Sequence, residues 1–297
     1  MFSNHGKRKK IILIGPPGSG KTSLTEVFFK RTNPLSLLNE PLAPTRGINA
    51  NIFILFGTKL GIFDLAGQEN NDWLNNNQAV FERANIIICM FDVRDSVESV
   101  ISFLIETLRK KKFMDTLSGC EIYALLHKID LFNKEYISRK IEAISKFFED
   151  QYQTGERINI FGTSIKKEYI LDTFLIILDL IKTTLEKNLI PINRRNYREL
   201  KIIIRILTKL DSSKKSTLEK IKSELRLEDK YFLNYLNKLE QRGFLSFDSD
   251  KKFVELTPYS KFIRRGLIER KMDGTKTKLL HTLLEIKEIS LDHYIIH

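Results

Sequence analysis

The stretch Gly15-Pro16-Pro17-Gly18-Ser19-Gly20-Lys21-Thr22 decides the fold of this chain. It fits the pattern G-x-x-x-x-G-K-[ST], whose glycines let the backbone wrap a phosphate group with its N–H groups. The apolar run before it, residues 10–14, predicts a buried parallel strand, and Ser23 opens a helix over residues 23–29. Strand, glycine turn and helix are the context that a phosphate-binding loop requires. We therefore expect Lys21 to reach the β- and γ-phosphates of a nucleotide and the Thr22 hydroxyl to ligate Mg²⁺.

Length and composition favour a soluble protein with one large or two modest domains. The chain has 297 residues, of which 42% are hydrophobic and 29% charged. Its two cysteines, Cys89 and Cys120, offer no disulfide framework, which favours a reducing compartment. The longest apolar run, residues 169–181, contains two aspartates and is too short to span a bilayer. We predict a cytoplasmic protein without a transmembrane segment.

Polar residues follow the next pair of strands, predicted over residues 51–56 and 59–64. Asp64 stands at the carboxyl end of the second strand, where a nucleotide-bound Mg²⁺ needs an anchor. Gly67 would let its backbone N–H approach a γ-phosphate, and Gln68 is placed to orient an attacking water. Upstream, Thr45 lies in a Pro/Gly-punctuated loop, so it can coordinate Mg²⁺ only while a γ-phosphate is present.

Strand and helix patterns alternate along the rest of the first 190 residues. Apolar runs at residues 85–93, 121–126 and 158–161 predict further strands, with a helix over residues 96–112 between the first two. The prediction is an α/β domain over residues 1–190, with a mostly parallel six-stranded sheet and helices on both faces. All five motifs then fall at the carboxyl ends of strands, where such sheets bind their ligands.

These motifs resemble those of the Ras superfamily of small GTPases, and within it the Rag branch. The Rag features are His127-Lys128-Ile129-Asp130 in place of the commoner Asn-Lys-x-Asp, the Gly67-Gln68 pair, and Thr163-Ser164-Ile165. The Thr45-x-Gly47 switch loop is closer to the Arf pattern. The resemblance covers about two-thirds of the chain.

The resemblance implies GTP and GDP as ligands, with Mg²⁺. Asp130 would accept hydrogen bonds from guanine, Lys128 would lie along the base, and a backbone N–H near Ser164 would approach the guanine oxygen. We expect slow hydrolysis of GTP that a partner protein stimulates. The alternative is that Arg46, from this chain itself, reaches the γ-phosphate and acts as the catalytic arginine. The predicted metal ligands are Thr22, Thr45 and Asp64, and the predicted catalytic residues are Gln68, Lys21 and Thr45. The predicted nucleotide-binding residues are Gly15, Pro16, Pro17, Gly18, Ser19, Gly20, Lys21, Thr22, Ser23, Gly67, His127, Lys128, Asp130, Thr163, Ser164 and Ile165.

Residues 191–297 are predicted to form a second, basic domain. They carry 24 of the 49 basic residues but 15 of the 37 acidic ones. Three predicted helices, the second starting at Ser216 and the third with Leu233 facing inward, precede a strand pair, which resembles a winged helix-turn-helix. A helical tail follows, which would pack across the domain or mediate dimerisation. The predicted DNA or partner contacts are Lys230, Tyr231, Asn234, Lys238, Gln241, Lys251 and Lys252.

Three functions stay open at this point. The first is a GTP-binding switch that hydrolyses GTP and signals through an activator, an exchange factor and an effector. The second is a nucleotide-gated, DNA-binding transcription regulator, and the third is a scaffold that binds nucleotide without turnover. Rag proteins carry a roadblock-type domain where this chain has its second domain. The resemblance therefore implies roadblock-type proteins as partners. Because this chain has a different second domain, the resemblance does not imply that it dimerises through a roadblock-type domain of its own.

Overall fold

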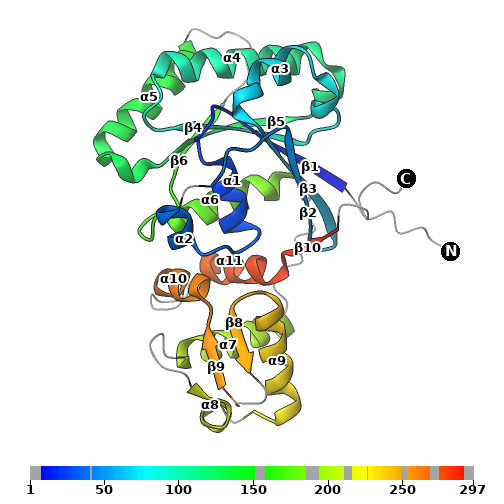
Figure 1. Cartoon of the computed structure of the whole chain (residues 1–297), viewed down its shortest axis with the longest axis vertical. Helices are drawn as coiled ribbons and strands as arrows, with labels where there is room; N and C mark the ends of the chain where they lie inside the picture. Colours follow the sequence, from blue (N-terminus) through cyan, green and yellow to red (C-terminus); the bar gives the residue numbers. More distant parts are fainter. Residues whose placement is uncertain are drawn as a thin grey trace, which may run out of the picture.

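The computed structural model describes residues 8–40, 42–150, 158–184, 194–210, 216–225, 227–248, 253–267 and 274–290. Figure 1 shows two lobes stacked along the long axis, an α/β lobe and a smaller, mainly helical lobe. No helix in these ranges is both long and apolar enough to cross a membrane.

The α/β lobe is built on one seven-stranded sheet with the order β10-β2-β3-β1-β4-β5-β6. Neighbouring strands from β3 to β6 run parallel, whereas β2 pairs antiparallel with β3. The central strands are continuous apolar runs because both of their faces are buried. The strands are β1 (Arg8–Ile14), β2 (Ile48–Leu55), β3 (Thr58–Leu65), β4 (Ile86–Asp92), β5 (Glu121–His127), β6 (Asn159–Thr163) and β10 (Lys287–Ile289).

Helices cover both faces of this sheet, as the sequence predicts. Alternate residues of β1 point to opposite cores: Ile11 and Leu13 to one, Ile12 and Ile14 to the other. The first core is closed by α1 and α6, and the second by α3, α4 and α5 (Figure 1). These helices are α1 (Lys21–Phe28), α3 (Asn70–Asn75), α4 (Val97–Phe113), α5 (Lys134–Asp150) and α6 (Ile170–Thr184), and the short α2 (Pro34–Asn39) follows α1.

The sheet has seven strands, one more than the six predicted. β10 comes from the C-terminal tail and pairs antiparallel with β2, with Glu288 opposite Phe53. Without it, β2 would be an edge strand with unpaired backbone N–H and C=O groups. The tail therefore packs against the first lobe as part of its sheet.

The smaller lobe combines helices with a three-stranded antiparallel sheet of order β7-β9-β8. Ser216 lies in β7 opposite Val254, so the second helix of this lobe begins two residues later than predicted. Leu233 is exposed, which makes the inward prediction for it wrong, while Phe232 and Leu236 are buried. The elements are α7 (Arg194–Lys209), β7 (Ser216–Thr217), α8 (Leu218–Leu225), α9 (Asp229–Gln241), β8 (Leu245–Asp248), β9 (Phe253–Leu256), α10 (Pro258–Leu267) and α11 (Gly274–Glu285).

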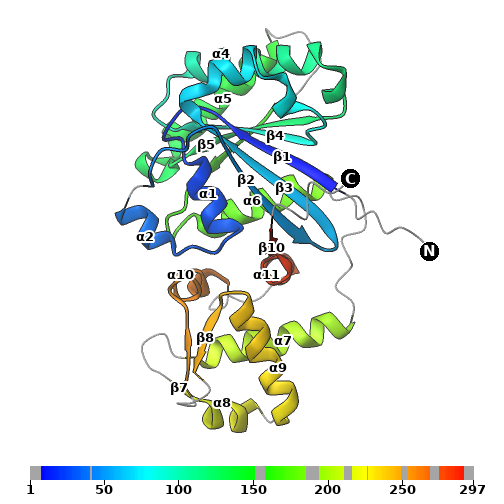
Figure 2. The same ribbon diagram turned by 45° about the vertical axis from the view of Figure 1, so that its right-hand side comes forward.

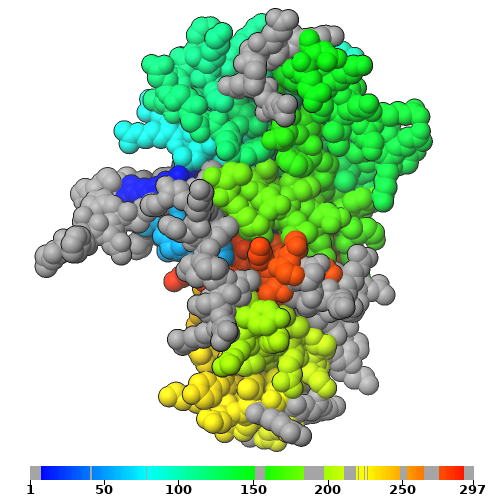
Figure 3. Space-filling view, turned by 180° about the vertical axis from the view of Figure 1, so that it is seen from behind, coloured from blue at the N-terminus to red at the C-terminus, as the bar shows by residue number. Residues whose placement is uncertain are grey.

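One continuous hydrophobic core joins the two lobes. It runs from β1 and α1 through α6 and α11 to α7 and α9. Figure 2 and the rear view in Figure 3 both place α11 between the lobes. At the end of α11, Arg31 donates to the carbonyl oxygens of Leu283 (2.7 Å) and Ile286 (2.5 Å), and Arg242 donates to that of Leu284 (2.7 Å). An arginine from each lobe thus caps the same helix end, which fixes how the lobes meet.

Candidate nucleotide site

A cavity of about 430 Å³ opens at the carboxyl ends of the parallel strands. Lys21 and Asp130, predicted for opposite ends of a nucleotide, both line it. The other predicted site residues that line it are Pro17, Gly18, Gly20, Thr22, Ser23, Thr45, Gly67, Gln68, His127, Lys128, Ser164 and Ile165. Those that do not line it are Gly15, Pro16, Ser19, Asp64 and Thr163, each of which contacts a lining residue.

The glycine loop between β1 and α1 lies hard against the neighbouring strands. Gly15 has a φ of +144°, and a Cβ atom there would lie 2.0 Å from the carbonyl oxygen of Met90. Gly20, with a φ of +97°, would bring a Cβ within 2.4 Å of the His127 ring. Both positions therefore require glycine, because any side chain would clash as well as strain the backbone.

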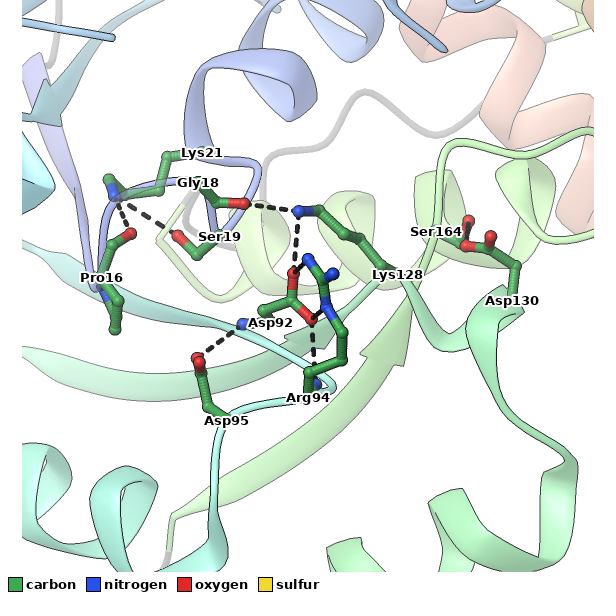
Figure 4. Close-up of polar contacts among 10 residues, drawn as sticks. All are labelled: Pro16, Gly18, Ser19, Lys21, Asp92, Arg94, Asp95, Lys128, Asp130 and Ser164. Carbon is green, nitrogen blue, oxygen red and sulfur yellow. Dashed lines mark hydrogen bonds and ion pairs between the residues drawn. The ribbon is translucent and has the colours of Figure 1, made fainter. Parts of the chain in front are cut away.

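The Lys21 ammonium is held over this loop (Figure 4). It donates to the carbonyl oxygens of Gly15 (2.7 Å) and Pro16 (2.9 Å) and lies 3.4 Å from the Ser19 hydroxyl. Burial lowers the pKa of Lys21 to about 8. Gly15, Pro16 and Ser19 thus serve the site by positioning the ammonium group.

Three oxygen-bearing side chains meet beside Lys21. The Thr22 hydroxyl donates to Asp64 Oδ2 at 2.5 Å and lies 3.0 Å from the Thr45 hydroxyl. Asp64 is fully buried, and burial raises the pKa of its carboxyl. Its Oδ1 atom has no hydrogen-bond partner among the residues that the structure describes. An unpartnered buried carboxylate oxygen beside two hydroxyls fits Mg²⁺, which prefers oxygen ligands.

Gly67 and Gln68 follow Asp64 in a short 3₁₀ turn, Gly67–Glu69. A Cβ on Gly67 would lie 2.4 Å from the backbone nitrogen of Pro17, so this turn packs directly on the glycine loop. Glu69 accepts a hydrogen bond from the Gly47 N–H at 2.9 Å, which ties the turn to the loop that carries Thr45. Gln68 lines the cavity from this turn.

Asp130 marks the opposite end of the cavity. Its carboxylate accepts a hydrogen bond from the Ser164 hydroxyl (2.5 Å) and pairs with Lys166 (3.0 Å). Burial raises the pKa of Asp130, but these two partners outweigh it, so the pKa lies below its usual value and the group is anionic. The Ser164 N–H donates a hydrogen bond to the Thr173 hydroxyl at 2.9 Å. Among the described residues the Ile165 N–H has no such acceptor, so of these two N–H groups it is the one left to donate to a guanine oxygen.

His127 takes the position of the commoner asparagine and is almost fully buried. Its Nδ1 atom lies 3.0 Å from the Thr163 hydroxyl, so Thr163 supports the His127 ring from behind. Burial, followed by the neighbouring Lys128 charge, lowers the pKa of His127 to about 4. The imidazole is therefore neutral at physiological pH and bridges β5, β6 and the glycine loop.

This buried imidazole predicts a pH-dependent stability. As pH falls below about 6.5, the unfolded chain takes up a proton on His127, while the folded chain does not until about pH 4. The free energy of unfolding should therefore drop by up to about 3 kcal/mol across that window and then level off for this group. Urea unfolding of wild type and His127→Asn from pH 7 to 4.5 measures the effect. The variant should show a flatter profile, and parallel profiles would contradict the assignment.

Asp92 and Arg94 do not line the cavity but support Lys128, a role that the motifs did not indicate. Lys128, in a left-handed conformation with φ +64°, donates to the Gly18 carbonyl oxygen (2.6 Å) and to Asp92 Oδ2 (2.8 Å). Arg94 donates three hydrogen bonds to the same carboxylate, two from its guanidinium group and one from its backbone N–H (Figure 4). Burial would raise the pKa of Asp92, but Arg94 and Lys128 hold it well below its usual range. The sequence feature that could have indicated this role is the position of Asp92 at the carboxyl end of the buried strand β4.

The predicted contacts of the smaller lobe divide into three groups. Lys230, Tyr231, Asn234 and Gln241 are exposed along α9. Lys238 is partly buried and pairs with Glu199 (2.8 Å) and Glu285 (3.6 Å), and its contact with DNA or a partner stays a prediction. Lys251 and Lys252 lie outside the described residues.

The sheet, the phosphate-binding loop and the base-end carboxylate together define a G protein of the Ras-like class. Residues 10–230 match the family model described as the Gtr1/RagA G protein conserved region, and the chain therefore belongs to this family. A stretch of 135 residues is 29% identical to the GTP-binding protein GTR1 of Saccharomyces cerevisiae (strain ATCC 204508 / S288c). That match covers 44% of this chain and 42% of the yeast protein, so it spans less than half of either. The Rag-like resemblance is confirmed.

Proposed function

We propose that this protein is a GTP-binding switch that slowly hydrolyses GTP to GDP. One observation carries the proposal: the Lys21 ammonium, the Thr22 and Thr45 hydroxyls and the Asp130 carboxylate line a single cavity. These groups match the phosphates, the metal ion and the base of one nucleotide, in that order. Membership of the G protein family supports the same function.

Each group has a separate task in the proposed mechanism. Lys21 and the loop amides bind the phosphate tail, with the N-terminus of α1 adding partial positive charge. Thr22 and Thr45, backed by Asp64, would hold Mg²⁺, which neutralises developing phosphate charge when bound. Asp130 would accept hydrogen bonds from N–H groups of guanine, whereas adenine presents no such N–H groups at the matching positions of its ring. Because Thr45 sits in a loop, its contacts depend on the state of the nucleotide.

Hydrolysis is expected to depend on Gln68. Gln68→Leu removes the group proposed to orient the attacking water, so single-turnover hydrolysis of bound GTP should slow by about tenfold or more. The affinity for GDP should stay within about twofold, because Gln68 lies away from the base end of the cavity. Rapid-quench assays on preloaded protein measure the rate. Equal rates for wild type and variant would support the non-hydrolysing scaffold instead.

We further propose that the smaller lobe is a winged helix-turn-helix that passes the nucleotide state to regulatory partners in the cytoplasm. Its support is the order of three helices and a three-stranded antiparallel sheet. Protein contact is favoured over DNA because Lys238 is already paired within the lobe. The exposed face of α9 keeps the DNA alternative testable. Gel-shift titration in a salt series should show no retardation, and steeply salt-dependent retardation would favour a DNA-binding regulator.

A further inference from the structure

A second cavity, of about 440 Å³, lies between α2 of the first lobe and α10 of the second. Figures 1 and 2 both place these two helices side by side where the lobes meet. We call it the α2–α10 groove. Its apolar lining consists of Leu35, Leu38, Pro258 and Phe262, and its polar lining of Lys166, Lys167, Glu168 and Lys261.

The α2 side of the groove exposes leucine side chains. Leu35 is 50% and Leu38 41% exposed, although α2 is only six residues long. The helix is nevertheless fixed at its start, because the Asn33 side chain accepts the Leu35 N–H and Pro34 occupies the first turn. A preformed helix that presents leucines to solvent beside a concave surface is typical of an interaction site.

The polar lining of the groove is mainly cationic. Three lysines face one glutamate, and Lys166 is already paired with Asp130. Within the described part of the chain, no carboxylate lies within ion-pair distance of the Lys167 or Lys261 ammonium group. An occupant with carboxylates placed beside apolar side chains would therefore match both the charge and the apolar surface of the groove.

We propose that the α2–α10 groove binds an acidic amphipathic segment of a partner protein. Apolar side chains of the segment would pack on Leu35, Leu38 and Pro258, and its carboxylates would meet Lys167 and Lys261. Because Pro258 and Phe262 come from the smaller lobe, the partner recognises both lobes at once. Neither lobe alone completes the groove.

The groove also adjoins the nucleotide cavity. Leu38 and Lys166 line both cavities, and α2 leads into the loop that carries Thr45. A nucleotide that engages Thr45 therefore acts on one wall of the groove. Affinity for the partner segment should therefore differ between the GDP and GTP forms. This difference rests on the proposed function, whereas binding of the segment to the groove does not depend on it.

The test uses the full chain and a synthetic, fluorescein-labelled 16-residue helical peptide with leucines on one face and glutamates beside them. Fluorescence anisotropy should show saturable binding that changes at least threefold between GDP and a non-hydrolysable GTP analogue. Leu35→Asp should weaken binding about tenfold or more, because it places a charge on the apolar wall. Lys261→Glu should weaken it about threefold, as expected for an exposed charge pair, and a peptide with lysines for glutamates should recover binding to this variant.

Several outcomes would overturn the groove proposal. The proposal would be wrong if the glutamate peptide did not bind, or if the lysine peptide bound wild-type protein as tightly as the glutamate peptide does. It would also be wrong if Leu35→Asp left the affinity for the glutamate peptide unchanged. Loss of self-association in Leu35→Asp by light scattering would make the groove a contact between two copies. Binding to vesicles of anionic phospholipid with no peptide binding would make it a membrane contact. Peptide binding without any nucleotide binding would instead count against the proposed function alone.

Discussion

Replacing Lys21 with methionine should weaken GDP and GTP binding by about a hundredfold or more. The methionine keeps most of the buried aliphatic volume but removes the ammonium group that the Gly15 and Pro16 carbonyls hold over the loop. Hydrogen bonds from a charged donor to phosphate are each worth about 1.5–3 kcal/mol, and the loop amides alone cannot replace them. Stopped-flow titration with a fluorescent guanine nucleotide measures the loss.

The matched control is Lys134→Met, which changes an exposed lysine at the start of α5 that does not line the cavity. It should bind nucleotide like the wild type. Thermal unfolding without nucleotide separates lost binding from lost folding, because both variants should unfold cooperatively. If Lys21→Met bound GDP within threefold of wild type while remaining folded, the phosphate assignment would be wrong.

Asp130→Asn should change the base preference of the nucleotide site from guanine to xanthine. The wild-type carboxylate accepts N–H groups of the base, and it is held in place by Ser164 and Lys166. An amide in its place presents one donor to a guanine N–H, which cannot accept it, but pairs with the second carbonyl oxygen of xanthine. A buried, mismatched hydrogen bond of this kind is expected to weaken GDP binding by about a hundredfold to a thousandfold.

Competition with GDP and XDP against a fluorescent nucleotide measures this exchange. XDP should become the better competitor for the variant and remain the poorer one for the wild type. Ser164→Ala is a useful companion, because it removes one support of Asp130 without changing the base-facing acceptor, and a loss of about tenfold or less is expected. Unchanged GDP affinity in Asp130→Asn would remove Asp130 from the base end of the site.

The sequence was most informative where local geometry dictates residue type. The glycine loop is an example: Gly15 and Gly20 are required by positive φ angles and by close backbone neighbours. The placing of Lys21 and Asp130 at one cavity followed from strand ends meeting at one sheet edge. Family membership then confirmed the Rag-like resemblance that the motifs indicated.

The sequence was least informative where a residue's partner lies far along the chain. β10 is three residues long and is defined only by its pairing with β2, so no local pattern marks it. Lys238 pairs with Glu199, which lies 39 residues earlier in the chain, and with Glu285. Asp92 was overlooked because the site residue it holds, Lys128, lies 36 residues further along the chain.

The central claim is that one cavity holds a guanine nucleotide between Lys21 and Asp130. Calorimetric titration of nucleotide-free protein with GDP, GTP, ADP and ATP in the presence of Mg²⁺ tests it most directly. We predict binding of both guanine nucleotides at least a thousandfold tighter than of either adenine nucleotide. Equal affinity for ATP and GTP, or no heat of binding with any of the four, would contradict it.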